Sequence, residues 1–579
     1  MNIRSSFFKR CLPLMTGLFL AWGVQAADTL DSIKAKAEAG DAQSQLALGM
    51  RYYMGDGVIQ HYGLAVEWIR KAAEGGNMVA QKNLGSIYLN GEGVEKDVDQ
   101  ALSWLARAAE QGDVFSASNL GVRYAKGEGV EKNGDLSVKY FTIAADKGDV
   151  ASQRNLGLIY LRGLGVAPDL AKARGWFEKA AAQGDVDSMA ELSVLLVNGM
   201  GGAKDPSKGV EWMKKAADSG HVMSAKNLGV IYYAGLGEQE KDLGAALKYL
   251  SVAAKENIPE ALFLMGRMNA NGDGVPKDDF EAYRYYEMAA KRGHLGSMNE
   301  LGYMADRGIG TEQSDAKAYD WYKKAAENGY TISQHNLGVM YLNGRGVAKD
   351  QDKAVEWFKK SAEAGNVRSQ AELAKIYEMS EKGQESDAEA FKWYKEAAER
   401  GVTSAQNKLG FFYDRGIGVK EDNNEAFKWY LKAAEGGFVI AQYNVGVMYA
   451  NGIGIEKDPA KAAQWFETAA ANGSLAANTE AGILYSRGSG MKKDGAKAEK
   501  YLSKAANAGI PNAQMTLGVL LTQGDLIQKN YVEAYKWFNL AAASGMTNAI
   551  SNREYVKQHM TKEEISKGQA LAAEFKPKQ

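Results

Sequence analysis

The chain has 579 residues and a net charge of −1, with 70 lysines and arginines against 71 aspartates and glutamates, and it holds 65 glycines but only 8 prolines. Because no basic stripe interrupts this balance, the sequence argues against extended phosphate contacts, and nucleic acid is not an expected partner. Its only cysteine, Cys11, lies near the N-terminus, so the remainder has no residue for a disulfide, a thiol nucleophile or a Cys-ligated metal.

The first 26 residues have the pattern of an export signal. A basic start is followed by an apolar run over residues 11–24, and Val24 and Ala26 supply the small residues of a cleavage site. We therefore predict residues 1–26 as a signal peptide cleaved after Ala26, and a periplasmic or secreted protein. The run is too short to span a bilayer, which disfavours the alternative of a retained anchor, and no later segment is predicted to span one.

A glycine that closes an alanine-rich segment recurs through the rest of the chain with a spacing of 36 residues. Fixed spacing of this kind is the signature of a stacked repeat. Asn257 replaces the glycine in one unit, which carries one extra residue; asparagine also tolerates the left-handed backbone needed after a helix end. The closing glycines are Gly40, Gly76, Gly112, Gly148, Gly184, Gly220, Gly293, Gly329, Gly365, Gly401, Gly437, Gly473, Gly509 and Gly545.

Each unit predicts two helices, and we number positions from the closing residue. Position 4 is small, position 9 is glycine in twelve of fourteen units and position 12 is tyrosine in ten, so these residues share one side of a first helix, helix A. A Gly-x-Gly pair at positions 15 and 17 ends helix A. Position 21 is usually aspartate, with Ser314 and Ser386 among its substitutes, and is predicted to cap a second helix, helix B. Helix B carries an aromatic residue at position 28, predicted to lie in the core.

One unit cannot bury its apolar surface alone, so the units must stack. The sequence predicts an all-α, α/α solenoid of about fourteen repeats over residues 41–545. Residues 27–40 are predicted to form an N-terminal capping helix and residues 546–579 C-terminal capping helices, the last starting at the capping-box sequence that begins with Thr561.

The repeat resembles the Sel-one-like repeat (SLR), a sub-family of tetratricopeptide-like (TPR-like) repeats. The resemblance covers residues 41–545 and is most complete in units such as Thr331–Gly365 and Val439–Gly473. It implies a right-handed superhelix whose concave face is lined by helix A. The fifth, seventh, tenth and fourteenth units depart from the pattern, and each is a candidate bend or partner-specific surface.

Apparent catalytic motifs coincide with repeat positions. Ser314 and Ser489 each begin a Ser-x-x-Lys sequence, but Ser314 lies in the helix B cap column and Ser489 inside a Gly-x-Gly loop. Asn271–Gly274 is similar to part of a calcium loop and lacks the remaining ligands. The five histidines never pair at metal-ligand spacing. We therefore expect no catalytic residue, no metal and no cofactor, and a protein that is not an enzyme.

Binding is predicted on the face of helix A opposite its core side, at positions 3, 6, 7, 10 and 14. Asparagine recurs at position 7, where its amide can pair with an extended peptide backbone, and basic or polar residues recur at position 6, where they can pair with carboxylates. The alternative is that the asparagines only join adjacent helices. The candidate binding residues are Asn83, Asn119, Asn155, Asn227, Asn336 and Asn444, with Lys82, Arg154, Lys226 and His335.

These observations predict an exported, monomeric scaffold that binds a protein or peptide partner, in envelope assembly, signalling regulation or host contact. Two other functions stay open. One is an envelope enzyme acting on peptidoglycan or β-lactams, an activity that the resemblance associates with cysteine-rich relatives. The other is a structural spacer without a partner.

Overall fold

The computed structural model describes residues 29–236, 239–380, 383–488 and 490–577. In this part the chain forms 31 α-helices and no strand, which confirms the all-α solenoid predicted from the repeats. The predicted signal peptide and Ser489 lie outside the described residues.

Fourteen helices correspond to helix A, fourteen to helix B, and three lie outside the repeats in the described part. The A helices are α2 Ala42–Met54, α4 Met78–Asn90, α6 Val114–Lys126, α8 Val150–Arg162, α10 Val186–Asn198, α12 Val222–Ala234, α14 Pro259–Asn271, α16 Leu295–Arg307, α18 Thr331–Asn343, α20 Val367–Glu378, α22 Thr403–Arg415, α24 Val439–Asn451, α26 Leu475–Arg487 and α28 Pro511–Gln523. The B helices are α3 Tyr62–Glu74, α5 Val98–Glu110, α7 Gly134–Asp146, α9 Leu170–Ala182, α11 Pro206–Asp218, α13 Leu243–Lys255, α15 Asp279–Ala290, α17 Asp315–Glu327, α19 Gln351–Glu363, α21 Gln384–Glu399, α23 Asn423–Glu435, α25 Pro459–Ala471, α27 Gly495–Asn507 and α29 Tyr531–Ala543. The others are α1 Leu30–Glu38, α30 Thr547–Lys557 and α31 Lys562–Ala573.

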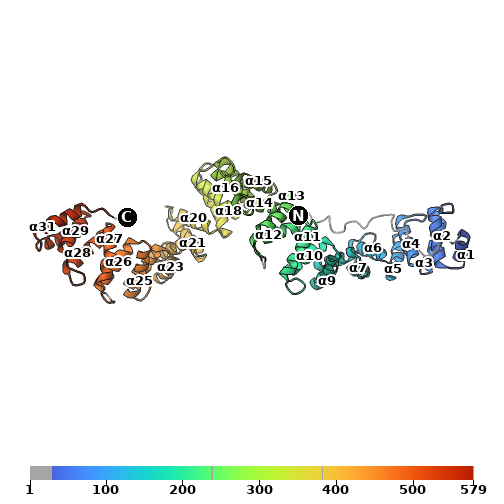
Figure 1. Ribbon diagram of the computed structural model, residues 1–579, viewed down its shortest axis with the longest axis horizontal. Coiled ribbons are helices and arrows are strands. Elements are labelled where there is room, and N and C mark those ends of the chain that lie inside the picture. The colour runs from blue at the N-terminus through green and yellow to red at the C-terminus, as the bar shows by residue number, and fades with distance from the viewer. Residues whose placement is uncertain (1–28, 237–238, 381–382, 489, 578–579) are drawn as a thin grey trace. The chain divides into compact units, whose positions relative to one another are not determined.

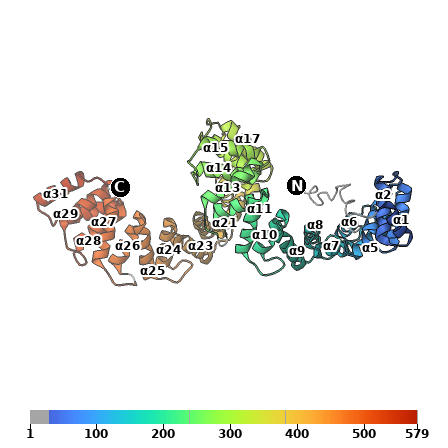
Figure 2. The same ribbon diagram turned by 45° about the vertical axis from the view of Figure 1, so that its right-hand side comes forward.

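The chain divides into two compact units, residues 1–297 and 298–579. Within each unit, a helix A packs on the helix B that follows it, and that helix B packs on the next helix A. The succession is visible along α5 to α10 in both views (Figure 1, Figure 2). Contacts therefore link neighbours in the chain, as expected for a repeat protein.

Helix A ends where the first glycine of the Gly-x-Gly pair adopts a left-handed conformation. Gly55 ends α2 with φ 75°, and its amide donates to the carbonyl of Arg51. The closing position has the same requirement, and Asn257, with φ 58°, is the one non-glycine residue with positive φ among those described. The backbone geometry thus explains both glycine columns and the asparagine substitution.

The core is centred on position 29, a column that the sequence analysis did not single out. All fourteen position-29 side chains are buried, and five of them are phenylalanines such as Phe141 and Phe177. They lie against the position-9 glycines: a Cβ added to Gly121 would come within 2.6 Å of the Phe141 ring. The glycine is therefore needed for helices A and B to approach each other with a large side chain between them.

A second unforeseen column is the buried glutamine at position 5. Its amide nitrogen donates to a carbonyl of the preceding helix B, as Gln81 does to Ala73 at 3.1 Å. In three units its oxygen also accepts from position 35 of the same repeat unit, as Gln81 does from Gln111 at 2.8 Å. Each such glutamine satisfies helix-end groups that would otherwise be buried without a partner. The column comprises Gln45, Gln81, Gln153, Gln334, Gln370, Gln406, Gln442 and Gln514.

The position-21 residues cap helix B with one exception. Asp97, for example, accepts from the amide of Gln100 at 2.9 Å, and Ser314 accepts from that of Lys317 at 3.3 Å. The prediction for Ser386 is wrong: α21 begins at Gln384, and Ser386 is buried inside that helix. The tenth unit lacks the Gly-x-Gly pair, and its helix B begins earlier than the column predicts.

At the C-terminal end, α31 begins after Thr561. Its capping box is formed: the Thr561 hydroxyl accepts from the Glu564 amide, and the Glu564 carboxylate accepts from the Thr561 amide at 2.8 Å. Helix α31 packs on α29, and α1 packs on α2. These helices cover the outer faces of the first and last repeats, which would otherwise be exposed.

Candidate functional site

Position-7 side chains lie over the seam between consecutive A helices. Asn336 on α18 donates to Asn299 on α16 at 3.1 Å, and Asn444 on α24 donates to Asn407 on α22 at 3.5 Å. Asn83 makes a long contact to the sulfur of Met50 on α2, at 3.6 Å, and is buried. These three predicted binding residues join adjacent helices, while their role toward a partner stays a prediction.

The other three asparagines lie on α6, α8 and α12. The Asn119 oxygen accepts from Arg123 on its own helix at 2.8 Å. Asn155 and Asn227 are half-buried and make no side-chain hydrogen bond to any described residue. Their amides are thus the two of the predicted set that are open to a partner.

The four candidate residues at position 6 each link their helix A to the start of the next one. Arg154 on α8 forms an ion pair with Asp185, the N-cap of α10, at 2.6 Å. The same position pairs Lys82 with Asp113 at 3.8 Å, Lys226 with Glu260 at 3.0 Å, and His335 with Ser369 at 2.9 Å. Burial lowers the pKa of the His335 imidazole, so it is neutral at pH 7. These four side chains therefore have partners inside the protein.

Glutamate is the other frequent residue at position 7, and the sequence analysis overlooked it. Glu372 is paired with Lys375 at 2.9 Å, and Glu300 accepts from Asn299 at 3.4 Å. Glu191 on α10 and Glu480 on α26 make no hydrogen bond or ion pair with any described residue. Burial raises the pKa of both carboxyl groups.

Apolar side chains at positions 3 and 10 give the helix-A face exposed hydrophobic surface. Ile332 on α18 is 49% exposed and Ile440 on α24 is 59% exposed, and both lie at position 3. Phe411 and Tyr303 are exposed at position 10. Exposed hydrophobic side chains recurring on one helix face mark a surface suited to a partner.

The position-28 tryptophans are only partly in the core. Trp104, Trp393, Trp429 and Trp537 are buried, but the other six are half-buried on helix B. A lysine one turn later often covers the exposed ring face; for example, the Lys179 ammonium lies 3.9 Å from the ring centroid of Trp176. The prediction that the position-28 aromatic residues lie in the core is therefore corrected for these six tryptophans, because the position-29 side chains fill the core instead.

The apparent catalytic motifs do not assemble in the described residues. The Ser314 hydroxyl caps α17, and Asp273 accepts hydrogen bonds from Tyr233 at 2.9 Å and Asn271 at 3.2 Å. No group of three or more metal-ligating side chains occurs within the described ranges. Over the same ranges, no helix is both long and apolar enough to cross a membrane.

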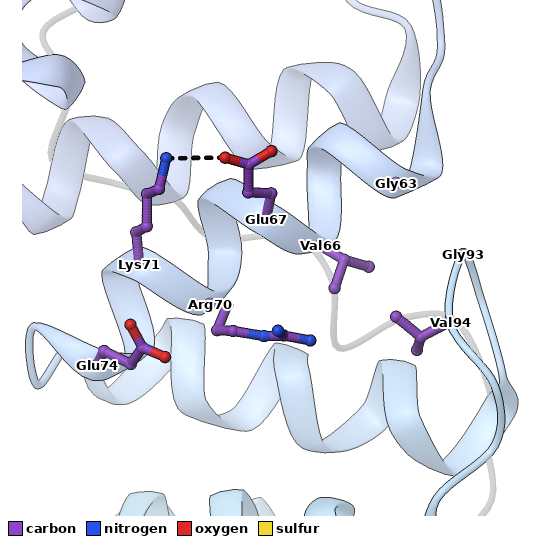
Figure 3. Close-up of a pocket in the computed structure, with 8 residues that line it drawn as sticks. All are labelled: Gly63, Val66, Glu67, Arg70, Lys71, Glu74, Gly93 and Val94. Atoms are coloured by element: carbon purple, nitrogen blue, oxygen red, sulfur yellow. Dashed lines mark hydrogen bonds and ion pairs between the residues drawn. The ribbon is translucent and has the colours of Figure 1, made fainter.

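One shallow pocket of about 300 Å³ lies on the helix B side of the first repeat. Its walls are α3, with Val66, Glu67 and Arg70, and the loop of the next repeat, with Val94 (Figure 3). Lys71 pairs with Glu67 at 2.9 Å, and Arg70 donates to the Tyr88 hydroxyl at 2.6 Å. Glu67, Arg70 and Lys71 thus have partners inside the protein, and we assign the pocket no function.

Comparison with known proteins identifies the repeat. A family model for the Sel1 repeat matches fourteen consecutive segments: residues 41–77, 79–113, 114–149, 150–185, 186–221, 222–258, 259–294, 296–330, 331–366, 367–402, 403–438, 439–474, 475–510 and 511–546. No curated protein has a sequence that matches this chain.

Among solved structures, the chain is similar to c5321, a protective antigen of uropathogenic Escherichia coli strains that displays an SLR fold. The two are 29% identical over 95% of this chain and 94% of that one, with a TM-score of 0.41. It is also similar to a Sel1 repeat protein from Oxalobacter formigenes, 29% identical over 62% of this chain and 94% of that one, with a TM-score of 0.35.

The fold and the helix-A face define an α/α solenoid built from helix-pair repeats. The chain belongs to the Sel1 repeat family, whose model matches almost all of residues 41–546. Sel1 and TPR-like repeats generally mediate protein–protein interaction, and the scaffold is typically non-catalytic.

Proposed function

We propose that the chain is an exported scaffold that binds a protein or peptide partner along its helix-A face, with roles in envelope assembly, signalling regulation or host contact. The observation that carries the proposal is the exposed apolar surface at positions 3 and 10, including Ile332 and Ile440. A solenoid presents such a face as one extended surface, which suits an extended polypeptide. The predicted signal peptide supports export.

Site-specific photocrosslinking tests the binding face. A photoreactive phenylalanine analogue replaces Ile332 or Ile440 on helix A, or Phe280 on helix B, which is 76% exposed and serves as the matched control. We expect one partner band shared by the two helix-A positions and absent at Phe280. Crosslinking from Phe280 alone, or from none of the three, would overturn the binding face.

Export is tested separately by N-terminal sequencing of the protein recovered from outside the cytoplasm. The proposal requires a mature chain that begins at Ala27. Recovery of the whole protein from the cytoplasm with residues 1–26 intact would contradict export and leave the binding face unaffected.

A further inference from the structure

At positions 6 and 7 of the helix-A face, the basic side chains are paired within the protein, whereas two acidic side chains are not. The cations Lys82, Arg154 and Lys226 are engaged in ion pairs with the next helix A. Glu191 and Glu480 are half-buried carboxylates without an ion pair or hydrogen bond to any described residue. A desolvated carboxylate without a partner is unfavourable, so a cation brought by a ligand gains more here than at a fully hydrated site.

The surroundings of Glu480 define what that cation can be. Because position-7 side chains lean toward the preceding helix A, as Asn444 does toward Asn407, Glu480 lies on the α24 side of α26. Burial, and after it the negative charge of Glu480, raises the pKa of the Tyr443 phenol on α24. The Tyr443 ring packs on Phe466, with 5.7 Å between centroids. A carboxylate beside an aromatic ring suits an ammonium or guanidinium group.

Apolar surface flanks both glutamates. Ile440, on the same helix as Tyr443, is largely exposed, and Val194 is exposed about one turn after Glu191 on α10. Lysine and arginine carry methylene stems that pack on such surface while the charged end reaches a carboxylate. The positive charges of Arg162 and Arg487 act against the effect of burial on the pKa of Glu191 and Glu480, respectively.

We propose that Glu480 and Glu191 are recognition points for lysine or arginine side chains of an extended polypeptide lying along the helix-A face. The inference rests on the proposed function, because it assumes that this face binds a polypeptide. It adds the polarity: the partner presents basic residues next to apolar ones. Glu191 and Glu480 belong to different compact units, so each provides such a point by itself.

Fluorescence anisotropy with defined peptides tests this polarity. The probes are a fluorescein-labelled peptide of repeated Lys-Ser-Leu triplets and its Glu-Ser-Leu counterpart, each added to the full chain. We expect the lysine peptide to bind and the glutamate peptide to bind far more weakly. Since a charge-assisted hydrogen bond contributes about 1.5–3 kcal/mol, the double variant E191Q/E480Q is expected to bind the lysine peptide roughly ten- to hundredfold more weakly.

The matched control is E372Q, which makes the same change at the same repeat position, where the carboxylate is already paired with Lys375. It is expected to leave peptide binding unchanged. Circular dichroism verifies that each variant is folded. Equal affinity for both peptides, no lysine-peptide binding below about 1 mM, or equal losses in E372Q and E191Q/E480Q would each overturn the proposal. If E191Q/E480Q binds the lysine peptide as tightly as the unmodified chain while Ile332 and Ile440 still crosslink the partner, cation recognition fails and the binding face stands. If neither position crosslinks a partner in the chain with its glutamates intact, the binding face itself fails.

Discussion

The glutamine column at position 5 predicts a stabilising substitution, Ala364→Gln. Gln334 donates to Ala326 at 3.3 Å, but its side-chain oxygen is buried without a hydrogen-bond partner. In the second repeat, Gln111 donates to the equivalent oxygen of Gln81 at 2.8 Å. Residue 364 occupies the position of Gln111, with φ −76° and ψ 5° against φ −78° and ψ −3° for Gln111. A glutamine at 364 should therefore reach Gln334 without a change of backbone.

The expected gain follows from two opposing effects. A buried acceptor without a partner costs about 1–3 kcal/mol, whereas ordering a glutamine side chain costs up to about 2 kcal/mol. We expect a net stabilisation of roughly 0.5–1 kcal/mol, which slows amide exchange of the α19–α20 pair roughly two- to fivefold.

Hydrogen-exchange mass spectrometry of the full chain measures this slowing. The control is Ser219→Gln, which places a glutamine at the same repeat position, where the residue thirty positions earlier is Met189, whose thioether is only a weak acceptor. Unchanged exchange of α19–α20 in A364Q, or an equal slowing around S219Q, would refute the reasoning.

Two further changes test the close helix contacts and the helix caps. Gly121→Ala should destabilise the protein by about 1–3 kcal/mol, because the new Cβ would meet the buried Phe141 ring. Gly175→Ala should stabilise it by roughly 0.5–1 kcal/mol, because the new Cβ meets nothing within 4 Å inside α9. Thermal unfolding measures both changes in stability, and changes of the same sign would contradict the packing account. His221 caps α12 by accepting from the Ser224 amide through Nδ1 at 3.1 Å, and burial lowers the pKa of its imidazole. The unfolded chain therefore binds the proton more readily, so stability is full above the unfolded pKa of about 6.5 and falls as the pH drops below it. His221→Asp should reduce this acid sensitivity in unfolding experiments across that pH range, and an unchanged pH dependence would exclude the cap as its source.

The sequence was sufficient for the repeat period, the glycine conformations and most helix caps, because each depends on one residue type at a fixed position. It was insufficient for the core column at position 29, where Ile69, Phe141 and Tyr286 share only size and burial. Ser386 was misplaced because the cap column assumes a Gly-x-Gly loop that its unit lacks. For the candidate site, the sequence indicated one face of helix A, but which polar groups on that face are free depends on the neighbouring helix. Glu480 and Glu372 are identical in the repeat pattern and differ only in having Lys375 one turn away from the second.

The alternation of packing between neighbours also governs how the protein responds to a pulling force. Contacts in each compact unit join a helix mainly to the helices just before and after it in the chain. An end repeat is therefore held mainly by the one repeat next to it. A chain stretched between its ends should lose its helix pairs one after another, as successive drops of similar size. Each 36-residue unit would release a contour of about 120 Å at roughly 3.4 Å per residue. The repeat architecture therefore lets the protein unfold and lengthen one repeat at a time under force, whereas a domain with a single core would unfold in one step.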